Sequence, residues 1–520
     1  MQPVFQYGAD QLDVKSATAL AKGRLQGMLT ETVKDKIARS QQFVQQMVME
    51  DATIYGVTTG FGILADKKIS SEEAATLQYK ILQSHSVGVG NAVSPHITRL
   101  MLVTKIQALA QGYSGIQLQT IERIVWHLQQ DVLPVVPEKG SVGASGDLAP
   151  LAHLFLPLVG LGEVLHNNIV SPSHEVLKKY NLPPLTLGPK EGLALINGTQ
   201  FIVAFAVQAI ERLQNCVEAA DIIGAMSLEA LTGTKAPFDE RLHQLRPFVG
   251  TQLVARRLRI LLEGSQIMQS HRDCGRVQDP YSLRCMPQVH GASRNALEHL
   301  KTVTEIELNA VTDNPVIFGE QDVISGGNFH GQPLALPLDY CCFAAAEVGN
   351  ISDRRCYLLL EGKWGLPLLL MNDVGLNSGF MIPQYTTAAL VTENKTLCFP
   401  ASADSIPTSL GQEDHVSMGS ISGRKLNQVL ENLEYILAIE LLSACQAIEF
   451  RRPLKSSAIL EFAHDHVREY VGFAEEDRIF ADDINKVAGL IKDFSFVNKV
   501  NEVASKKGIE LNKGFNWLIN

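Results

Sequence analysis

The strongest constraint on the fold is the stretch from Arg424 to Phe450, which contains neither proline nor glycine. Apolar side chains recur through it at i, i+3, i+4 and i+7 spacing, which predicts one amphipathic helix. At about 1.5 Å per residue such a helix is roughly 40 Å long. Helices of this length with apolar faces are typical of helix bundles.

Three other stretches share this pattern: Gln200 to Thr232, Ala292 to Val311 and Pro337 to Leu360. The most apolar run, Phe201 to Ile210, is too short to span a bilayer and reads as a buried helix. We therefore expect a mainly α protein, in which a long central helix bundle accompanies a smaller N-terminal domain.

The segment Asn167 to Gly192 is rich in Pro, Asn and Gly, so we place a domain boundary there, giving an N-terminal domain at 1–192 and a bundle domain at 193–520. Long polar or Gly/Pro-rich connections follow it. They run over Thr232–Gly250, Gly275–Gly291, Gly319–Pro333 and Gly375–Gly423. Connections of this length are usually functional or disordered, and their Arg, Gln, Tyr and Glu content favours function.

Composition narrows the class of partner and the compartment. The 520-residue chain has a formal net charge of −10 and no dense Lys/Arg run, which argues against nucleic acid. Its eight cysteines form no C-x-x-C pair, and several lie in apolar helical runs, so we expect reduced core thiols. The N-terminus lacks a secretory pattern. We expect a cytoplasmic protein that has no membrane partner.

The stretch "KGSVGASGDLAPLAHL", 139–154, is the most unusual local sequence. Part of it predicts a connector followed by a helix, with Asp147 as the N-cap and Pro150 in the first turn. Its glycines do not match phosphate-binding loops, and Gly143 to Asp147 lacks the second glycine of a nucleophile elbow. No H-E-x-x-H motif occurs, and we expect no metal.

The tripeptide Ala144-Ser145-Gly146 permits a further interpretation. In a tight turn, the amide nitrogen of Gly146 can attack the carbonyl carbon of Ala144 and close a five-membered ring. Loss of water from the ring and from the Ser145 side chain leaves a methylene conjugated to a carbonyl, which is a strong electrophile. Gly146 lacks the Cβ that would obstruct this attack, and Ala144 is small.

This segment resembles the cofactor-forming segment of the aromatic amino acid ammonia-lyase family, in which Ala-Ser-Gly becomes 4-methylideneimidazole-5-one (MIO). The resemblance runs from about Tyr55 to Arg452, and eight further motifs appear in family order. They are "YGVTTGFG" (55–62), "LQSHSVGVG" (82–90), "LINGTQ" (195–200), "VQDPYSLRC" (277–285), "NAVTDNP" (309–315), "SGGNFHGQP" (325–333), "GLNSGFMIPQYTTAAL" (375–390) and "GQEDHVSMG" (411–419).

The resemblance implies roles for residues outside the turn. Tyr55 resembles the tyrosine that abstracts the β-proton, and its phenol would have to be acidified by its surroundings. Tyr281 resembles the second tyrosine, which orients or protonates near the MIO group. Arg284 is suited to binding the substrate carboxylate through two parallel hydrogen bonds.

Three more residues complete the implied substrate site. Asn197 and Gln278 resemble the amides that hydrogen-bond the substrate and the MIO oxygen, and Phe329 resembles the aromatic wall of the site. Without the motifs, Asn197-Gly198 could equally be a plain turn, and Phe329 a core phenylalanine.

Two positions bear on the substrate. Ser84-His85 and Glu413 match the branch of the family that acts on histidine: Glu413 can accept a hydrogen bond or a proton from an imidazole, and His85 can bond the same ring. A phenyl ring offers neither partner, and each polar group left unpaired in a closed site would cost about 1–3 kcal/mol. The resemblance thus implies elimination of ammonia from L-histidine to give trans-urocanate.

Alternatives remain within the family: a tyrosine or phenylalanine ammonia-lyase, or an aminomutase that moves the amine to the β-carbon. A non-catalytic helical assembly protein is a more distant alternative. Thr58, Met286, His290 and Gly411 depart from the usual pattern of the histidine branch and bear on the shape of the pocket. The resemblance also implies a homotetramer whose active sites take loops from three subunits.

Overall fold

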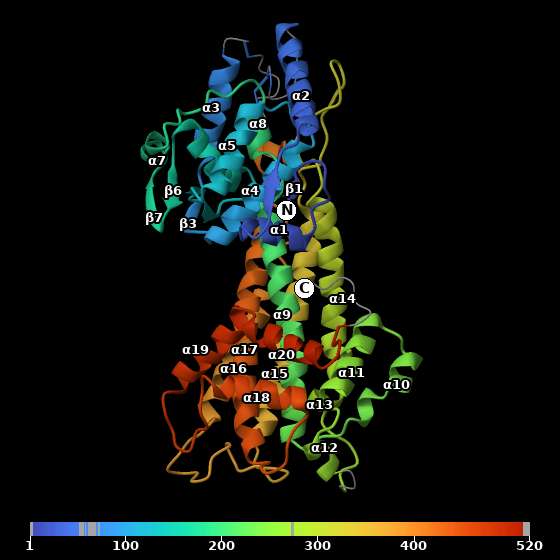
Figure 1. Cartoon of the computed structure of the whole chain (residues 1–520). Helices are drawn as coiled ribbons and strands as arrows, with labels where there is room; N and C mark the ends of the chain where they lie inside the picture. The colour runs from blue at the N-terminus through green and yellow to red at the C-terminus, as the bar shows by residue number, and fades with distance from the viewer. Residues whose placement is uncertain are drawn as a thin grey trace. The chain divides into compact units, whose positions relative to one another are not determined.

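The fold is mainly α, as the sequence predicts (Figure 1). A computed structural model describes residues 4–50, 57, 59–60, 69–70, 73–271 and 275–512. Within these ranges there are twenty α-helices and nine short strands.

The chain forms two compact units, each assembled from separate stretches. Unit 1 contains residues 1–208, 300–338 and 400–424, and unit 2 contains residues 209–299, 339–399 and 425–520. The predicted division was instead into two continuous segments. The boundary at residue 192 therefore stays a prediction about how the chain is organised.

Unit 1 combines short helices with short strands. Its helices are α1 (Val14–Ala21), α2 (Glu31–Met49), α3 (Ala74–His85), α4 (Pro95–Ala110), α5 (Leu118–Gln129), α6 (Leu148–Phe155), α7 (Ser173–Lys179) and α8 (Glu191–Ile196), with the 3₁₀ turns η2 (Leu156–Val159) and η4 (Ser409–Gly411). Its strands are β1 (Val4–Gln6), β2 (Gln26–Met28), β3 (Val89–Ala92), β4 (Leu133–Pro134), β5 (Pro137–Lys139), β6 (Glu163–His166), β7 (Ile169–Pro172), β8 (Val316–Ile317) and β9 (Val323–Ile324).

These strands form small, separate sheets. Strands β1 and β2 pair in parallel, with Val4 opposite Gln26, while β3–β5, β4–β6–β7 and β8–β9 are antiparallel. The β3–β5 pair ends at Lys139, four residues before the Gly143–Gly146 bridge that closes the Ala-Ser-Gly turn. Strand pairing therefore holds the segment that leads into this turn.

Unit 2 is built from helices. Those that lie wholly within it are α10 (Glu240–Leu245), α11 (Val249–Leu261), α12 (Gln266–Ser270), α13 (Tyr281–Arg284), α16 (Met381–Leu397), α18 (Ala458–Arg468), α19 (Phe480–Lys492) and α20 (Ser495–Lys506), together with η3 (Ala236–Phe238). The boundaries between the units fall inside four long helices: α9 (Gln200–Ala230), α14 (Met286–Glu307), α15 (Gln332–Leu359) and α17 (Gly419–Glu449).

These four long helices are the four stretches that the apolar periodicity predicts, with ends shifted by a few residues. In α17, Leu426, Leu433 and Leu441 are fully buried, as the apolar spacing requires. Helix α14 begins at Met286, earlier than the predicted Ala292, and α15 begins at Gln332 rather than Pro337. The prediction of a long-helix bundle is confirmed.

The predicted connection over Gly375–Gly423 is wrong in part, because it contains the 17-residue helix α16. The buried positions of α16 are Pro383, Thr387 and Asn394, which give no apolar stripe. Thr387 donates a hydrogen bond to Asp353 at 2.5 Å, and Asn394 accepts one from Asn432 at 2.9 Å. A helix packed through polar contacts has no hydrophobic period to reveal it.

The seven cysteines among the described residues are free thiols, and five of them are buried. Burial raises the pKa of these buried thiols, which keeps them protonated. Cys274 lies outside the described residues. Across the described ranges, we find no helix that combines the length and apolar character needed to cross a membrane.

Candidate active site

The Ala-Ser-Gly segment is a tight turn in unit 1. Gly143 and Gly146 face each other as an isolated antiparallel bridge, so the chain reverses over Ala144 and Ser145. Ser145 has φ +51° and Gly146 has φ +80°. A positive φ at a non-glycine residue is strained and persists only where its surroundings enforce it.

The peptide between Asn197 and Gly198 lies against this turn. The N–H of Gly198 donates to the Ser145 carbonyl at 3.3 Å, and the N–H of Asp147 donates to the Gly198 carbonyl at 2.8 Å. A Cβ on Gly146 would lie 2.1 Å from that carbonyl oxygen. Only glycine therefore fits at position 146.

The sequence prediction for Asp147 is half right. Helix α6 does begin at Leu148, but the Asp147 side chain makes no capping bond to it. Asp147 is fully buried and instead accepts hydrogen bonds from the Phe201 and Ile202 N–H groups, in the first turn of α9, at 3.1 and 3.0 Å. It thus ties the turn to another helix, a long-range contact that local spacing does not reveal.

Burial raises the pKa of Asp147 to about 7, although hydrogen bonds from the Ile202 N–H, the Ser141 hydroxyl and the Phe201 N–H act against this. The Ser141 hydroxyl lies 2.9 Å from the carboxylate. The carboxylate therefore has donors from both the turn and α9.

Two buried lysines lie in the same unit. Lys105 of α4 is 2% exposed, and its Nζ donates to the Asn197 carbonyl at 2.5 Å. Lys190 donates to Asp313 at 2.6 Å and to the Ser114 carbonyl at 3.0 Å. Burial lowers the pKa of Lys105 to about 7; the charges of Asp313 and Asp147 act against this and that of Lys190 adds to it.

Lys105 is not among the residues predicted from the sequence, although the sequence carries a signal for it. The residue is a lone cation in the apolar run from Leu100 to Ala110, where nearly every side chain is buried. A charged side chain is almost never fully buried unless a partner holds it.

Glu413 reaches the turn from the loop before α17. Its Oε1 accepts a hydrogen bond from the Ser145 hydroxyl at 3.2 Å, and its Oε2 accepts one from Thr408 at 2.9 Å. Thr408, which is not among the residues predicted from the sequence, thus orients the carboxylate. The structure brings together Ser145 and Glu413, which lie far apart in the sequence.

His85 ends helix α3 and is half-buried. Burial lowers its pKa, while a hydrogen bond to the Ile81 carbonyl and the negative charge of Glu413 act in the opposite direction. His85 thus lies within electrostatic reach of Glu413. Its Nδ1 is 3.0 Å from the Ser84 hydroxyl.

Two other predicted site residues belong to the same unit. Asn197 is 2% exposed, and its side-chain amide donates to the Asn314 carbonyl at 3.0 Å. Phe329 lies in the loop before α15 and is half-buried rather than a fully enclosed core residue. Tyr55 lies outside the described residues.

The remaining predicted residues, Gln278, Tyr281 and Arg284, belong to unit 2. Gln278 is exposed, and Tyr281 is 70% exposed. The Arg284 guanidinium lies 4.4 Å from the centre of the Tyr281 ring and donates to the Asp279 carbonyl at 3.0 Å. Arg284 is half-buried, so the exposed Tyr281 ring is the more accessible of the two side chains.

The departures from the family pattern fall in varied environments. Met286 and His290 are fully buried in α14, and Asp221 lies 2.8 Å from His290 Nδ1. Burial lowers the pKa of His290, although the hydrogen bond to Asp221 acts against this. His290 is therefore a hydrogen-bonded core residue. Gly411 is exposed with φ +93°, and Thr58 lies outside the described residues.

The turn fits the ring closure that the sequence suggests. It reverses over Ala144 and Ser145 and excludes any side chain at Gly146. The Gly198 N–H donates to the Ser145 carbonyl, and Glu413 accepts from the Ser145 hydroxyl. Elsewhere among the described residues, no group of three or more His, Cys, Asp or Glu side chains is arranged to hold a metal ion.

Comparison with known proteins agrees with this geometry. The sequence profile of the family described as "Aromatic amino acid lyase" matches residues 12–469. The histidine ammonia-lyase of Idiomarina loihiensis is 47% identical over 468 residues, which is 89% of this chain and 92% of that protein.

Two solved structures show the same fold. The histidine ammonia-lyase of Trypanosoma cruzi superposes with a TM-score of 0.88 at 40% identity, covering 96% of this chain and 95% of its own. The tyrosine aminomutase of Streptomyces globisporus gives a TM-score of 0.91 at 33% identity, covering 96% and 99%. The chain therefore belongs to the aromatic amino acid lyase family.

Proposed function

We propose that this protein is a histidine ammonia-lyase, which converts L-histidine to trans-urocanate and ammonia without a redox step. The carboxylate of Glu413, held 3.2 Å from the Ser145 hydroxyl and within electrostatic reach of His85, carries this proposal. Similarity to relatives named histidine ammonia-lyase supports it.

We further propose that Ala144-Ser145-Gly146 forms the MIO group. The lone pair of Gly146 N attacks the Ala144 carbonyl carbon. That oxygen leaves as one water with the hydrogens of Gly146 N and Ser145 N, and a double bond forms between the Ala144 carbon and Ser145 N. The Ser145 hydroxyl leaves as a second water together with the Ser145 α-hydrogen. When formed, the group supplies an electrophilic carbon that draws electrons from the bound substrate. The enforced turn and the absence of a Cβ at Gly146 support this step.

Loss of the Ser145 hydroxyl also removes the donor that occupies Glu413 Oε1. Glu413 is then available to accept a hydrogen bond or a proton from the substrate imidazole, while Thr408 keeps the carboxylate in place through Oε2. His85 can bond the same ring. A phenyl or phenol ring would leave Glu413, His85 or both without a hydrogen-bond partner, which costs about 1–3 kcal/mol for each unpaired group.

The other roles follow the family resemblance. Arg284 binds the substrate carboxylate, and Asn197 and Gln278 hydrogen-bond the substrate and the Ser145 carbonyl oxygen. Tyr55 accepts the β-proton; the electron pair of the broken C–H bond forms the double bond, and the amine leaves with the C–N pair. Tyr281 orients or protonates nearby groups, and Phe329 forms the aromatic wall.

We also propose a homotetramer with shared active sites in the cytoplasm. Helix α15 exposes side chains at Tyr340, Phe343, Glu347, Arg354 and Tyr357, at steps of three, four or seven residues. The three aromatic residues are 50%, 43% and 52% exposed. Such spacing matches the contact seam of packed helices, which supports burial against another copy. The free thiols fit a reducing compartment.

Intact-mass measurement and substrate assays test this function. The purified protein should be lighter than its sequence mass by two water molecules, and only L-histidine should produce urocanate absorbance. Cinnamate or coumarate from phenylalanine or tyrosine, or a β-amino acid product, would identify another member of the family. An unmodified mass would refute the proposed chemistry and favour a non-catalytic protein.

A further inference from the structure

The peptide between Asn197 and Gly198 is hydrogen-bonded at both of its ends. Its carbonyl accepts from Lys105 Nζ at 2.5 Å, and its N–H donates to the Ser145 carbonyl at 3.3 Å. Hydrogen bonds in series polarise one another, because each accepted bond makes the next donor more positive. A buried ammonium at one end therefore strengthens the N–H donor at the other.

The Ser145 carbonyl is the oxygen that this donor reaches. In the ring proposed above, this carbonyl is retained and is conjugated with the methylene carbon derived from the Ser145 side chain. When a nucleophile adds to that carbon, electron density moves onto the Ser145 oxygen. A donor fixed at the place where negative charge develops lowers the barrier to the addition.

We propose that Lys105 is a positioning residue that activates the electrophile from a distance: its ammonium polarises the Asn197–Gly198 peptide, which withdraws electron density from the Ser145 carbonyl. This inference rests on the proposed formation of the MIO group. Lys105 reaches the Ser145 carbonyl only through this peptide and takes no part in the proton transfers.

The contrast between the two buried lysines supports this assignment. Lys190 is paired with the carboxylate of Asp313 at 2.6 Å, which neutralises much of its field. Lys105 instead donates a hydrogen bond to a neutral carbonyl. Burying a cation costs free energy unless a polar or charged partner binds it. When that partner is a neutral carbonyl, the cation polarises the carbonyl strongly.

The test compares three variants. Lys105→Met removes the charge of Lys105, and Lys105→Arg keeps it. Lys190→Met removes the charge of the other buried lysine, which does not bond to the Asn197–Gly198 peptide. The rate of addition of mercaptoethanol is followed by intact mass at about pH 6, where Lys105, with a pKa of about 7, carries its proton. This readout needs no substrate. Circular dichroism confirms that each variant is folded.

We expect addition to Lys105→Met to be slower by about tenfold or more, since a hydrogen bond to a charged group contributes about 1.5–3 kcal/mol. Lys105→Arg should recover most of the rate, and Lys190→Met should react like the parent. If Lys105→Met does not fold, Lys105→Gln provides a smaller uncharged donor and should show the same slowing.

Equal addition rates in the parent and in the folded uncharged variant would overturn the inference, as would an equal loss in Lys190→Met. Failure of the proposed function looks different, since the parent itself would then retain the mass of both waters and would not add the thiol.

Discussion

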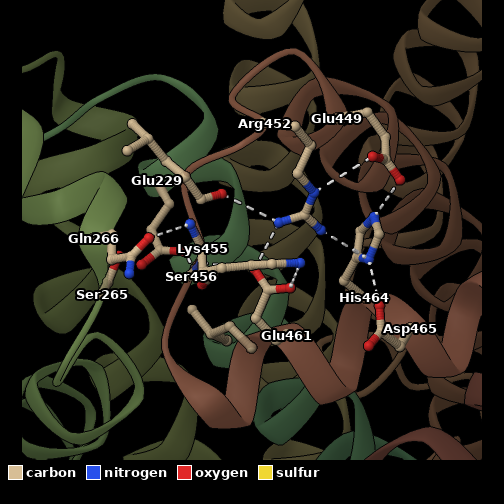
Figure 2. Close-up of polar contacts among 12 residues, drawn as sticks. Glu229, Ser265, Gln266, Glu449, Arg452, Lys455, Ser456, Glu461, His464 and Asp465 are labelled. Carbon is tan, nitrogen blue, oxygen red and sulfur yellow. Dashed lines mark hydrogen bonds and ion pairs between the residues drawn. The ribbon is translucent and has the colours of Figure 1, made fainter.

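Two buried polar regions of this chain use charge in different ways. In unit 1, Asp147 and Lys105 direct their charges at backbone groups around the Ala-Ser-Gly turn. In unit 2, charged side chains around Arg452 pair mainly with one another (Figure 2). The first arrangement holds a strained backbone in one conformation, whereas the second cross-links helices.

The unit 2 cluster contains Glu229, Glu449, Arg452, Ser456, Glu461 and His464 (Figure 2). Arg452 donates to Glu461 at 2.7 Å and lies 3.5 Å from Glu449, and His464 Nε2 lies 2.9 Å from Glu449. Its carboxylates come from α9, α17 and α18. Arg452 and Ser456 lie between α17 and α18 in the chain and contact these carboxylates. Changes in this cluster should alter stability, and changes at the turn should alter chemistry.

The largest effect is expected from Gly146→Ala. The added Cβ would lie 2.1 Å from the Gly198 carbonyl oxygen, and φ is +80°. We expect loss of ring closure and of measurable lyase activity, checked by intact mass and urocanate formation.

Gly264→Ala is the matched control in unit 2. Gly264 has φ +78°, but nothing lies within 4 Å of an added Cβ, and its neighbours Ser265 and Gln266 belong to the region of Figure 2. This variant should lose about 1 kcal/mol of stability through backbone strain alone and keep its activity. Equal loss of activity in both variants would mean that strain, rather than the contact with Gly198, controls the turn.

A smaller effect on catalysis is expected from Glu413→Gln. The neutral amide can no longer accept a proton from an imidazole, so kcat with L-histidine should fall about 100-fold. Because Glu413 is only half-buried, the free energy of unfolding should change by less than about 0.5 kcal/mol.

Glu449→Gln in the unit 2 cluster should behave in the opposite way. Glu449 pairs with His464 at 2.9 Å and with Arg468 at 3.3 Å, so its loss should lower the free energy of unfolding while kcat stays near the parent value. Steady-state kinetics and urea titrations on Glu413→Gln and Glu449→Gln measure both kcat and the free energy of unfolding. A parental kcat in Glu413→Gln would contradict the imidazole assignment.

The two regions also differ in how far the sequence predicts them. The four long helices are predicted because burial of one face sets their apolar period. The turn is predicted because the ring closure requires each of its three residue types. Helix α16 is missed because its buried contacts, such as Thr387 to Asp353, are polar.

The partners of Asp147 and Lys105 are missed for a different reason. Asp147 bonds to residues 54 and 55 positions away, and Lys105 to a residue 92 positions away. Such contacts depend on how the helices pack, so they produce no recognisable residue pattern in the sequence. The roles of Gln278, Tyr281 and Arg284 came from motifs alone, and they stay predictions because these residues lie in unit 2.

The smallest effects should come from two carboxylates of the unit 2 cluster that both contact Ser456. Glu229 accepts from the Ser456 hydroxyl, and Glu461 from the Ser456 N–H at 2.6 Å. Burial raises the pKa of Glu229 to about 7, against hydrogen bonds from Ser265 and Ser456. Burial also acts to raise the pKa of Glu461, but hydrogen bonds from Arg452 and the Ser456 N–H outweigh it and lower that pKa.

These opposite directions predict opposite pH dependences. Folded protein binds more protons at Glu229 than unfolded protein does between pH 4.5 and about 7, so the stability from this group is lost as pH rises through that range. Relative to the parent, Glu229→Gln should therefore gain about 3 kcal/mol of stability as the pH rises from 4.5 to about 7, since one pKa unit corresponds to about 1.4 kcal/mol. Glu461 contributes stability above pH 4.5 that is lost as pH falls, so Glu461→Gln should be about 1 kcal/mol less stable near neutrality and converge with the parent in acid.

Urea titrations at fixed protein concentration over this pH range measure both differences, since association would otherwise shift the apparent stability. If the two variants changed with the same sign, Glu229 and Glu461 would be sharing protons as one coupled site around Ser456. The cluster would then resemble the turn region, where several charged groups act on one backbone segment, and the contrast between the two regions would fail at this point.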